Sequence, residues 1–77
     1  MPVKDAVRTV WQDVLAKPVA DDSDFFALGG DSMAALSISA RLEESFRVRP
    51  KLRVLFDQPR FDDYALAYIR LVEEAAK

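Results

Sequence analysis

The sequence predicts an all-α protein, a small antiparallel four-helix bundle with three long helices and one short helix. Apolar residues recur at spacings of three and four in three separate stretches, which is the period of amphipathic helices. Neither the β-type alternation that would build a sheet nor an internal repeat is present. Because 77 residues can enclose one hydrophobic core, we expect a single domain over residues 1–77.

The first helix is expected over residues 3–16. Pro2 suits its first turn, because proline has no N–H to leave unpaired there, and Lys17-Pro18 ends it. Trp11 lies within the apolar stripe, so we expect this side chain in the core and not in a binding site. The stripe consists of Val3, Val7, Val10, Trp11, Val14 and Leu15.

Residues 17–31 form a connection longer than most loops in compact domains, and loops of this length tend to be functional or disordered. We expect order here, since the apolar side chains of Phe25, Phe26 and Leu28 can hold the loop against the bundle. The acidic run at residues 21–24 does not have the spacing of an EF-hand loop. We therefore expect a solvated turn there and no metal site.

The loop ends in Gly29-Gly30-Asp31-Ser32, after which the sequence has the pattern of a second helix. Two glycines allow a sharp turn and the close approach of another molecule, and Asp31 can cap the helix through the N–H of residue 33 or 34. Ser32 then lies in the first helical turn, beside unpaired N–H groups and the positive end of the helix dipole. Such a position favours a phosphate-bearing group, so Ser32 is a candidate site for a phosphate ester.

The second helix should run over residues 32–46 and carry two apolar faces. At about 100° per residue, one stripe of its helical wheel faces the core, and Met33, Leu36 and Ala40 lie on the opposite side, next to Ser32. A core helix needs no second stripe, so we expect these three side chains to be exposed and to form a partner surface. The core stripe consists of Ala34, Ala35, Ile38, Leu42 and Phe46.

Three further stretches complete the bundle. Basic residues alternate with apolar ones over 47–53, which we interpret as a solvated loop because aromatic residues for base stacking are missing. The alternative for this loop is that it steers an anionic cofactor or an acidic partner. A short helical turn is expected over residues 52–56, before Asp57-Gln58-Pro59. The last helix is expected over residues 61–76, with its aromatic side chains in the core and acidic residues in its first turn.

Composition excludes several functional classes. The chain has no histidine and no cysteine, so a Ser-His-Asp triad, thiolate catalysis and metal sites with His or Cys ligands are ruled out. A formal net charge of −2 gives no field that would indicate a nucleic-acid partner. The sequence has no signal segment and no apolar run long enough to span a membrane, and a cysteine-free chain suits a reducing compartment. We therefore expect a cytoplasmic protein without a membrane partner.

The nine residues Phe25-Phe26-Ala27-Leu28-Gly29-Gly30-Asp31-Ser32-Met33 resemble the phosphopantetheine attachment signature of carrier (thiolation) domains of nonribosomal peptide synthetases. The resemblance extends over nearly the whole chain. Trp11 with Val14-Leu15 is similar to the first-helix pattern of the family, and residues 55–59 are similar to its short third helix, which closes with a proline. Two phenylalanines, Leu-Gly-Gly and Asp-Ser at the right distance are specific to this signature.

The resemblance to peptidyl carrier proteins implies how this chain works. Ser32, with Gly30 and Asp31 beside it, would receive 4′-phosphopantetheine from coenzyme A through a separate magnesium-dependent phosphopantetheinyl transferase. The modified domain would carry aminoacyl or peptidyl thioesters as a non-catalytic monomer, because the reactive thiol is imported. Its further partners would be an adenylation enzyme and condensation, epimerisation or tailoring enzymes. Met33 and Leu36 match positions that partners of the family contact.

Two positions depart from the family's pattern. Asp31 stands where many members have histidine, and within the family this choice is associated with carriers that serve an epimerisation domain or that are free-standing. Arg60 stands where the family commonly has threonine after the proline, so a helix cap is lost. We expect the last helix either to fray at its start or to have its first N–H groups satisfied in another way.

Three other functions stay open at this point. An aryl, acyl or polyketide carrier would use the same arm and fold, although fatty-acid and polyketide carriers normally have a strongly acidic second helix, and here Glu43 and Glu44 stand against Arg41. A hydrolase using Ser32 is disfavoured, because no histidine can activate the hydroxyl and the Gly-x-Ser-x-Gly elbow is missing. The remaining alternative is an interaction module that is never modified.

Overall fold

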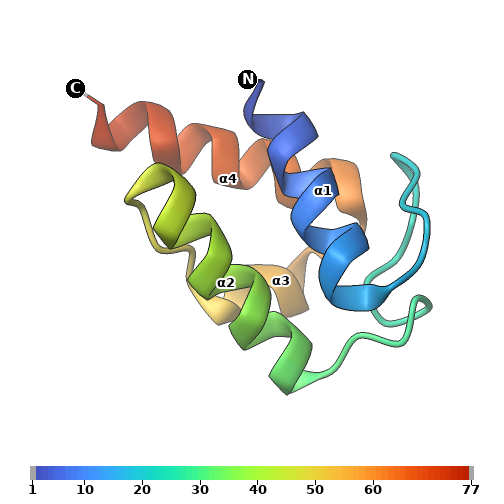
Figure 1. Ribbon diagram of the computed structural model, residues 1–77. Coiled ribbons are helices and arrows are strands. Elements are labelled where there is room, and N and C mark those ends of the chain that lie inside the picture. Colours follow the sequence, from blue (N-terminus) through green and yellow to red (C-terminus); the bar gives the residue numbers. More distant parts are fainter. Residues whose placement is uncertain (1, 77) are drawn as a thin grey trace.

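The computed structural model describes residues 2–76, and within this range it contains four helices and no strand. The first two are α1, Val3–Leu15, and α2, Ser32–Phe46, which run in opposite directions (Figure 1). The short helix α3, Leu52–Asp57, and the long helix α4, Phe61–Ala75, follow. The prediction of an all-α bundle with three long helices and one short one is therefore confirmed.

The helix ends differ from the predicted ones by a single residue where they differ at all. Ala16, expected as the last residue of the first helix, is its C-cap in the left-handed conformation, with φ of 57°. Its N–H still bonds to the Gln12 carbonyl at 2.8 Å. Arg47 ends α2 in the same way, with φ of 63° and a 2.7 Å bond to the Glu43 carbonyl. Neither residue is a glycine, so the usual sequence signal for this kind of helix end is absent.

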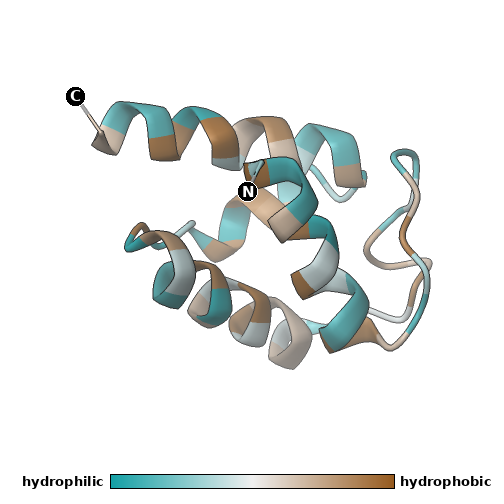
Figure 2. Cartoon of the chain, turned by 45° about the horizontal axis from the view of Figure 1, so that its top comes forward, coloured by the Kyte–Doolittle hydropathy of each residue, from teal (hydrophilic) through white to brown (hydrophobic). Residues whose placement is uncertain are grey.

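Aromatic side chains form the centre of the core, and the fully buried Trp11 lies in their middle, as its place in the stripe predicted. Its ring lies edge-on to Phe25 at 5.7 Å and to Phe61 at 5.2 Å between ring centroids, and 5.6 Å from Tyr64. Figure 2 shows that hydrophobic residues recur along each long helix between hydrophilic ones. The buried apolar residues are Val7, Trp11, Val19, Phe25, Ala35, Ile38, Leu42, Leu55, Phe61, Tyr64, Ala65 and Tyr68.

Tyr68 ties α4 to the C-terminal end of α2. Its hydroxyl donates to the Val48 carbonyl at 2.8 Å and lies 3.2 Å from the Leu42 carbonyl. Burial, with a smaller contribution from the negative charge of Glu43, raises the pKa of Tyr68 to about 12. The hydroxyl therefore keeps its proton at neutral pH and serves as a donor to the backbone.

The long loop, residues 16–31, supplies the missing cap of α4. Arg60 offers no side-chain cap to this helix, but the loop carbonyls take its place. The Ser23 carbonyl accepts from Phe61 N at 2.7 Å, the Asp21 carbonyl accepts from Asp62 N at 3.0 Å, and Phe25 N donates to the Pro59 carbonyl at 2.8 Å. Of the two outcomes expected at Arg60, the second is confirmed, because the first N–H groups are satisfied by another segment.

Arg8 of α1 holds the first half of the loop. Its guanidinium lies over the Phe61 ring, 4.6 Å from the centroid, donates to the Val19 carbonyl at 2.6 Å, and pairs with the Asp21 carboxylate. Lys4 approaches the same carboxylate at 3.4 Å. The hydrogen bond from Arg8, followed by that from Lys4, holds the pKa of Asp21 below its usual value. One exposed carboxylate thus links the loop to two turns of α1.

This ion pair predicts a specific pH dependence of stability. A carboxylate whose pKa is lower in the folded state stabilises the fold above its unfolded pKa, and this contribution is lost as the pH falls through the folded value. We expect the melting temperature of the wild type to fall more than that of Asp21→Asn below about pH 4. Because the pair is exposed, the difference should be small and should shrink at high salt.

Thermal melts between pH 7 and pH 3 at low and high salt would check this, with Asp22→Asn as the control. Asp22 is the exposed neighbour of Asp21 and forms no ion pair with any of residues 2–76. Equal pH profiles for wild type and Asp21→Asn would show that the pair contributes nothing to folding.

Candidate functional site

Ser32 is the first residue of α2, and its side chain is exposed. It lies where the long loop enters α2, and the connection to α3 leaves from the opposite end of that helix (Figure 1). Within residues 2–76 no group forms a hydrogen bond with its hydroxyl. An enzyme that approaches this end of α2 can therefore reach the oxygen atom without unfolding any part of the chain.

A tight turn delivers the chain to Ser32. The N–H groups of Leu28, Gly29 and Gly30 donate to the carbonyls of Asp24, Phe26 and Phe25 at 3.0, 3.0 and 2.9 Å, respectively. Gly29 has φ of +89°, a conformation that is strained for residues with a side chain. The predicted sharp turn is thus present, and it depends on glycine at this position.

Gly30 is required for a different reason, which is packing inside the chain. A Cβ at this position would lie 2.4 Å from Cζ of the Phe25 ring, closer than real side chains approach. We expected the glycines to admit another molecule, but at Gly30 the group that needs the space is the chain's own buried Phe25. The same ring anchors the loop in the core beside Trp11. Packing of Phe25 in the core therefore fixes the turn before Ser32.

Asp31 is the N-cap of α2, as predicted. Its carboxylate accepts from Ala34 N at 2.9 Å, and its carbonyl accepts from Ala35 N at 2.9 Å. Within residues 2–76 the N–H groups of Ser32 and Met33 have no acceptor, so both can receive a ligand oxygen. Together with the positive end of the helix dipole, they make the position suited to a phosphate ester on the Ser32 oxygen.

The apolar face beside Ser32 is open to solvent. Met33 is 75% exposed and Leu36 is 46% exposed, and Ala40 is exposed as well. The helical wheel thus placed these three residues on the correct side. The core stripe is also as predicted, since Ala35, Ile38 and Leu42 are buried and Ala34 and Phe46 pack against the core.

Two phenylalanines are exposed as well, and the sequence interpretation missed both. Phe26, expected to hold the loop against the bundle, is 48% exposed; only Phe25 and, in part, Leu28 do that. Its ring stacks on that of Phe56, which is 40% exposed, with centroids 5.9 Å apart and planes 15° from parallel. Phe56 lies on α3, which packs against α2. The signal in the sequence for the exposure of Phe56 was its position near the end of a helix of only six residues.

The acidic run of the loop has structural roles. Asp21 pairs with Arg8 and Lys4, and Asp24 accepts from Ala27 N at 2.9 Å. Over the part of the chain that the structure describes, no group of three or more acidic side chains could hold a metal ion. In the same part of the chain, no helix has the length and apolar character needed to cross a membrane.

Comparison with known proteins identifies the family. The phosphopantetheine attachment site family matches residues 5–67. Over 59 residues, 75% of this chain, the sequence is 39% identical to phosphinothricin tripeptide synthetase PhsC of Streptomyces viridochromogenes. It covers 5% of the length of that protein, so this chain corresponds to a small part of its curated relatives.

Solved structures agree with the sequence match. A non-ribosomal peptidyl carrier protein (PCP) domain superposes with a TM-score of 0.73 at 34% identity, with 83% of each chain covered. A peptidyl carrier protein solved with the phosphopantetheine transferase Sfp and coenzyme A has a TM-score of 0.83 at 25% identity, covering 91% of this chain and 92% of that one. The family is defined by the attachment of 4′-phosphopantetheine, which the exposed serine at the start of α2 suits. The chain therefore belongs to the phosphopantetheine attachment family, and within it to the peptidyl carrier domains.

Proposed function

We propose that Ser32 is the residue that receives the 4′-phosphopantetheine arm. Its oxygen would bond to the phosphorus of the phosphopantetheine moiety of coenzyme A, the pyrophosphate bond would break, and adenosine 3′,5′-bisphosphate would leave while the hydroxyl proton is lost. A separate phosphopantetheinyl transferase would catalyse this step. The observation that carries the proposal is the exposed hydroxyl at the first residue of α2, directly after the Gly29-Gly30 turn. In this proposal Gly30 and Asp31 shape the site and do not touch the arm's thiol.

The modified domain would carry aminoacyl or peptidyl groups as thioesters between enzymes that assemble a peptide. We propose that it is not itself a catalyst, since the chain has no histidine or cysteine and the reactive thiol would come with the arm. An adenylation enzyme would load it, and condensation, epimerisation or tailoring enzymes would use the product. We propose further that residues 1–77 form one monomeric carrier domain that works in the cytoplasm.

A carrier for aryl, acyl or polyketide groups is the second candidate, because such a carrier would use the same arm. Helix α2 contains two acidic residues, Glu43 and Glu44, and one basic residue, Arg41. This low acidic content favours the aminoacyl carrier. A loading assay distinguishes the two functions. The protein carrying the arm would be incubated with adenylating enzymes for amino acids and for aryl or acyl acids. Thioester formation with amino acids is the expected result, and loading by aryl or acyl acids alone would favour the second candidate.

The exposed residues Met33, Leu36 and Ala40 are proposed as the surface that partners contact. Leu36→Asp or Met33→Asp should slow loading by an adenylation enzyme about 30-fold, the effect of a residue central to an interface. The unfolding free energy should change by no more than about 0.5 kcal/mol, because neither side chain is buried in the core. Initial loading rates and thermal melts measure both quantities.

Leu66→Asp is the matched control for this surface. Leu66 is an exposed leucine on α4 with an exposed fraction of 48%, close to the 46% of Leu36. The same change at Leu66 should leave the loading rate unaltered. Equal slowing by both substitutions would indicate a general effect of added charge, and unfolding of Leu36→Asp would place that residue in the core.

A further inference from the structure

A lysine side chain lies beside the turn that leads to Ser32. Lys17 follows Ala16, the left-handed C-cap residue of α1, and is exposed. A methyl group added to Gly29 would have the Lys17 Nζ atom as its neighbour, at 3.7 Å. The side chain therefore carries its positive charge from the end of α1 across to the glycine turn.

Lys17 has no anionic partner within the described part of the chain. It is the one basic residue of the sequence between Arg8 and Arg41, and it forms no ion pair with any of residues 2–76. Asp24 and Asp31, the carboxylates on either side of the turn, accept from backbone N–H groups instead, each at 2.9 Å. The charge of Lys17 is thus available to an anion that is not part of the polypeptide.

Attachment to Ser32 would bring such an anion to the turn. In the carrier function proposed above, the phosphorus of the arm is bonded directly to the Ser32 oxygen, and the phosphodiester has one negative charge. Ser32 follows Gly29 by three residues, and three residues span at most about 11 Å. The ammonium of Lys17 stands on a flexible four-carbon stem and is free to turn toward this end of α2. A contact between the two charges is therefore within reach of the side chain.

We propose that Lys17 binds the phosphodiester at the root of the 4′-phosphopantetheine arm and holds the first atoms of the arm beside the Gly29-Gly30 turn. The contact would be a charge-assisted hydrogen bond from Nζ to a phosphate oxygen. Lys17 would act as a positioning residue, because it would direct the arm toward the end of α1 as the arm leaves Ser32. The inference rests on the proposed function, which supplies the anion.

The test is NMR of ¹³C,¹⁵N-labelled protein to which a transferase has added an unlabelled arm. Intact mass would first establish that each chain carries one arm. Isotope-filtered NOE spectra should then show contacts between the ε-methylene of Lys17 and the arm's methylene group next to the phosphate. The contacts should be present at about 10 mM salt and lost at about 1 M salt, where the Debye length is only about 3 Å.

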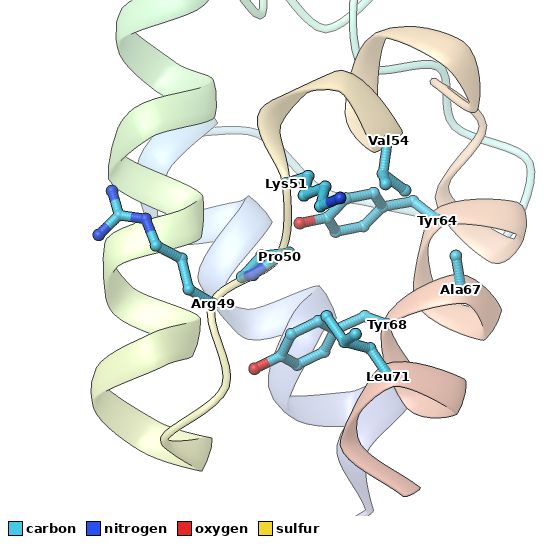
Figure 3. A pocket seen from close by; sticks show the side chains of 8 residues that line it. All are labelled: Arg49, Pro50, Lys51, Val54, Tyr64, Ala67, Tyr68 and Leu71. Carbon is cyan, nitrogen blue, oxygen red and sulfur yellow. The ribbon is translucent and has the colours of Figure 1, made fainter. Parts of the chain in front are cut away.

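Lys51 provides the matched control. It is also exposed and unpaired, but it lies where the connection from α2 enters α3 (Figure 3), and that connection leaves the end of α2 opposite to Ser32. The ³¹P resonance of the arm should shift between low and high salt in the wild type and in Lys51→Gln. Most of this shift should be lost in Lys17→Gln and retained in Lys17→Arg, which keeps the charge.

The outcomes separate this inference from the function on which it rests. Absence of Lys17 contacts at low salt, in protein that carries the arm on Ser32, would overturn the inference and leave the carrier function intact. An equal salt dependence of the ³¹P resonance in Lys17→Gln and Lys51→Gln would overturn it as well. Failure of the wild type to gain an arm would refute the carrier function, and the role of Lys17 with it.

Discussion

Ser32→Ala is expected to abolish attachment of phosphopantetheine. After incubation with coenzyme A, magnesium and a phosphopantetheinyl transferase of broad specificity, the wild type should gain one arm and the variant none. The physical reason is that Ser32 carries the one side-chain hydroxyl among residues 2–76 that lies in the first turn of α2, directly after the Gly29-Gly30 turn. Alanine at the first helical position should leave folding nearly unchanged, because the cap is provided by Asp31 and not by Ser32.

Ser37→Ala is the matched control for this experiment. Ser37 is an exposed serine on the same helix, one and a half turns further on. This variant should be modified at the rate of the wild type. Modification of Ser32→Ala to any stoichiometric extent would show that the arm is attached elsewhere, and loss of modification in Ser37→Ala would show that α2 as a whole was disturbed.

Gly30→Ala is expected to give the largest loss of stability among the changes near the site. The new methyl group would lie 2.4 Å from the Phe25 ring, which is fully buried and in contact with Trp11, so the ring cannot move aside without disturbing the core. Overpacking of this kind costs about 1–3 kcal/mol. In a domain of this size the melting temperature should fall by about 4–8 °C for each kcal/mol. Attachment of the arm should slow as well, because the turn before Ser32 is displaced.

Thermal melts and initial modification rates of Gly30→Ala and Gly29→Ala would check this. A methyl group at Gly29 meets only the Lys17 ammonium, at 3.7 Å, but the left-handed backbone there costs a residue with a side chain about 1–2 kcal/mol. The double variant Phe25→Leu/Gly30→Ala should lose less stability than the sum of its single changes, since the smaller side chain relieves the clash. A melting temperature of Gly30→Ala equal to that of the wild type would contradict the packing explanation.

The helices could be predicted because each one is set by a local pattern. The spacing of apolar residues located the three long helices, and the wheel of α2 separated the core stripe from the exposed Met33, Leu36 and Ala40. The cap from Asp31 was likewise readable, since it joins residues three apart in the sequence. In each of these cases the determining contacts lie within a few residues of one another.

The orientation of the loop side chains could not be predicted. Phe25 and Phe26 are neighbours with the same chemistry, and a loop has no period that would assign one to the core. The choice is made by Gly30, whose missing side chain leaves room for Phe25, and by Phe56, on which Phe26 stacks. Both contacts depend on the tertiary fold.

The replacement cap of α4 and the hydrogen bonding of its two tyrosines are non-local for the same reason. The carbonyls that accept from Phe61 and Asp62 come from residues about forty positions earlier. The hydroxyl of Tyr64 stays unpaired while that of Tyr68 is used, although both belong to the same apolar stripe. The sequence marks the stripe, but only the packing of α4 against the end of α2 decides which hydroxyl reaches a backbone acceptor.

The central claim is that the arm is attached to the Ser32 oxygen, and tandem mass spectrometry of the modified wild type tests it most directly. Fragment ions should place the added phosphopantetheine mass on Ser32 and leave Ser23, Ser37, Ser39 and Ser45 unmodified. Localisation of that mass on any other residue, or failure of the chain to gain it with an active transferase, would contradict the claim.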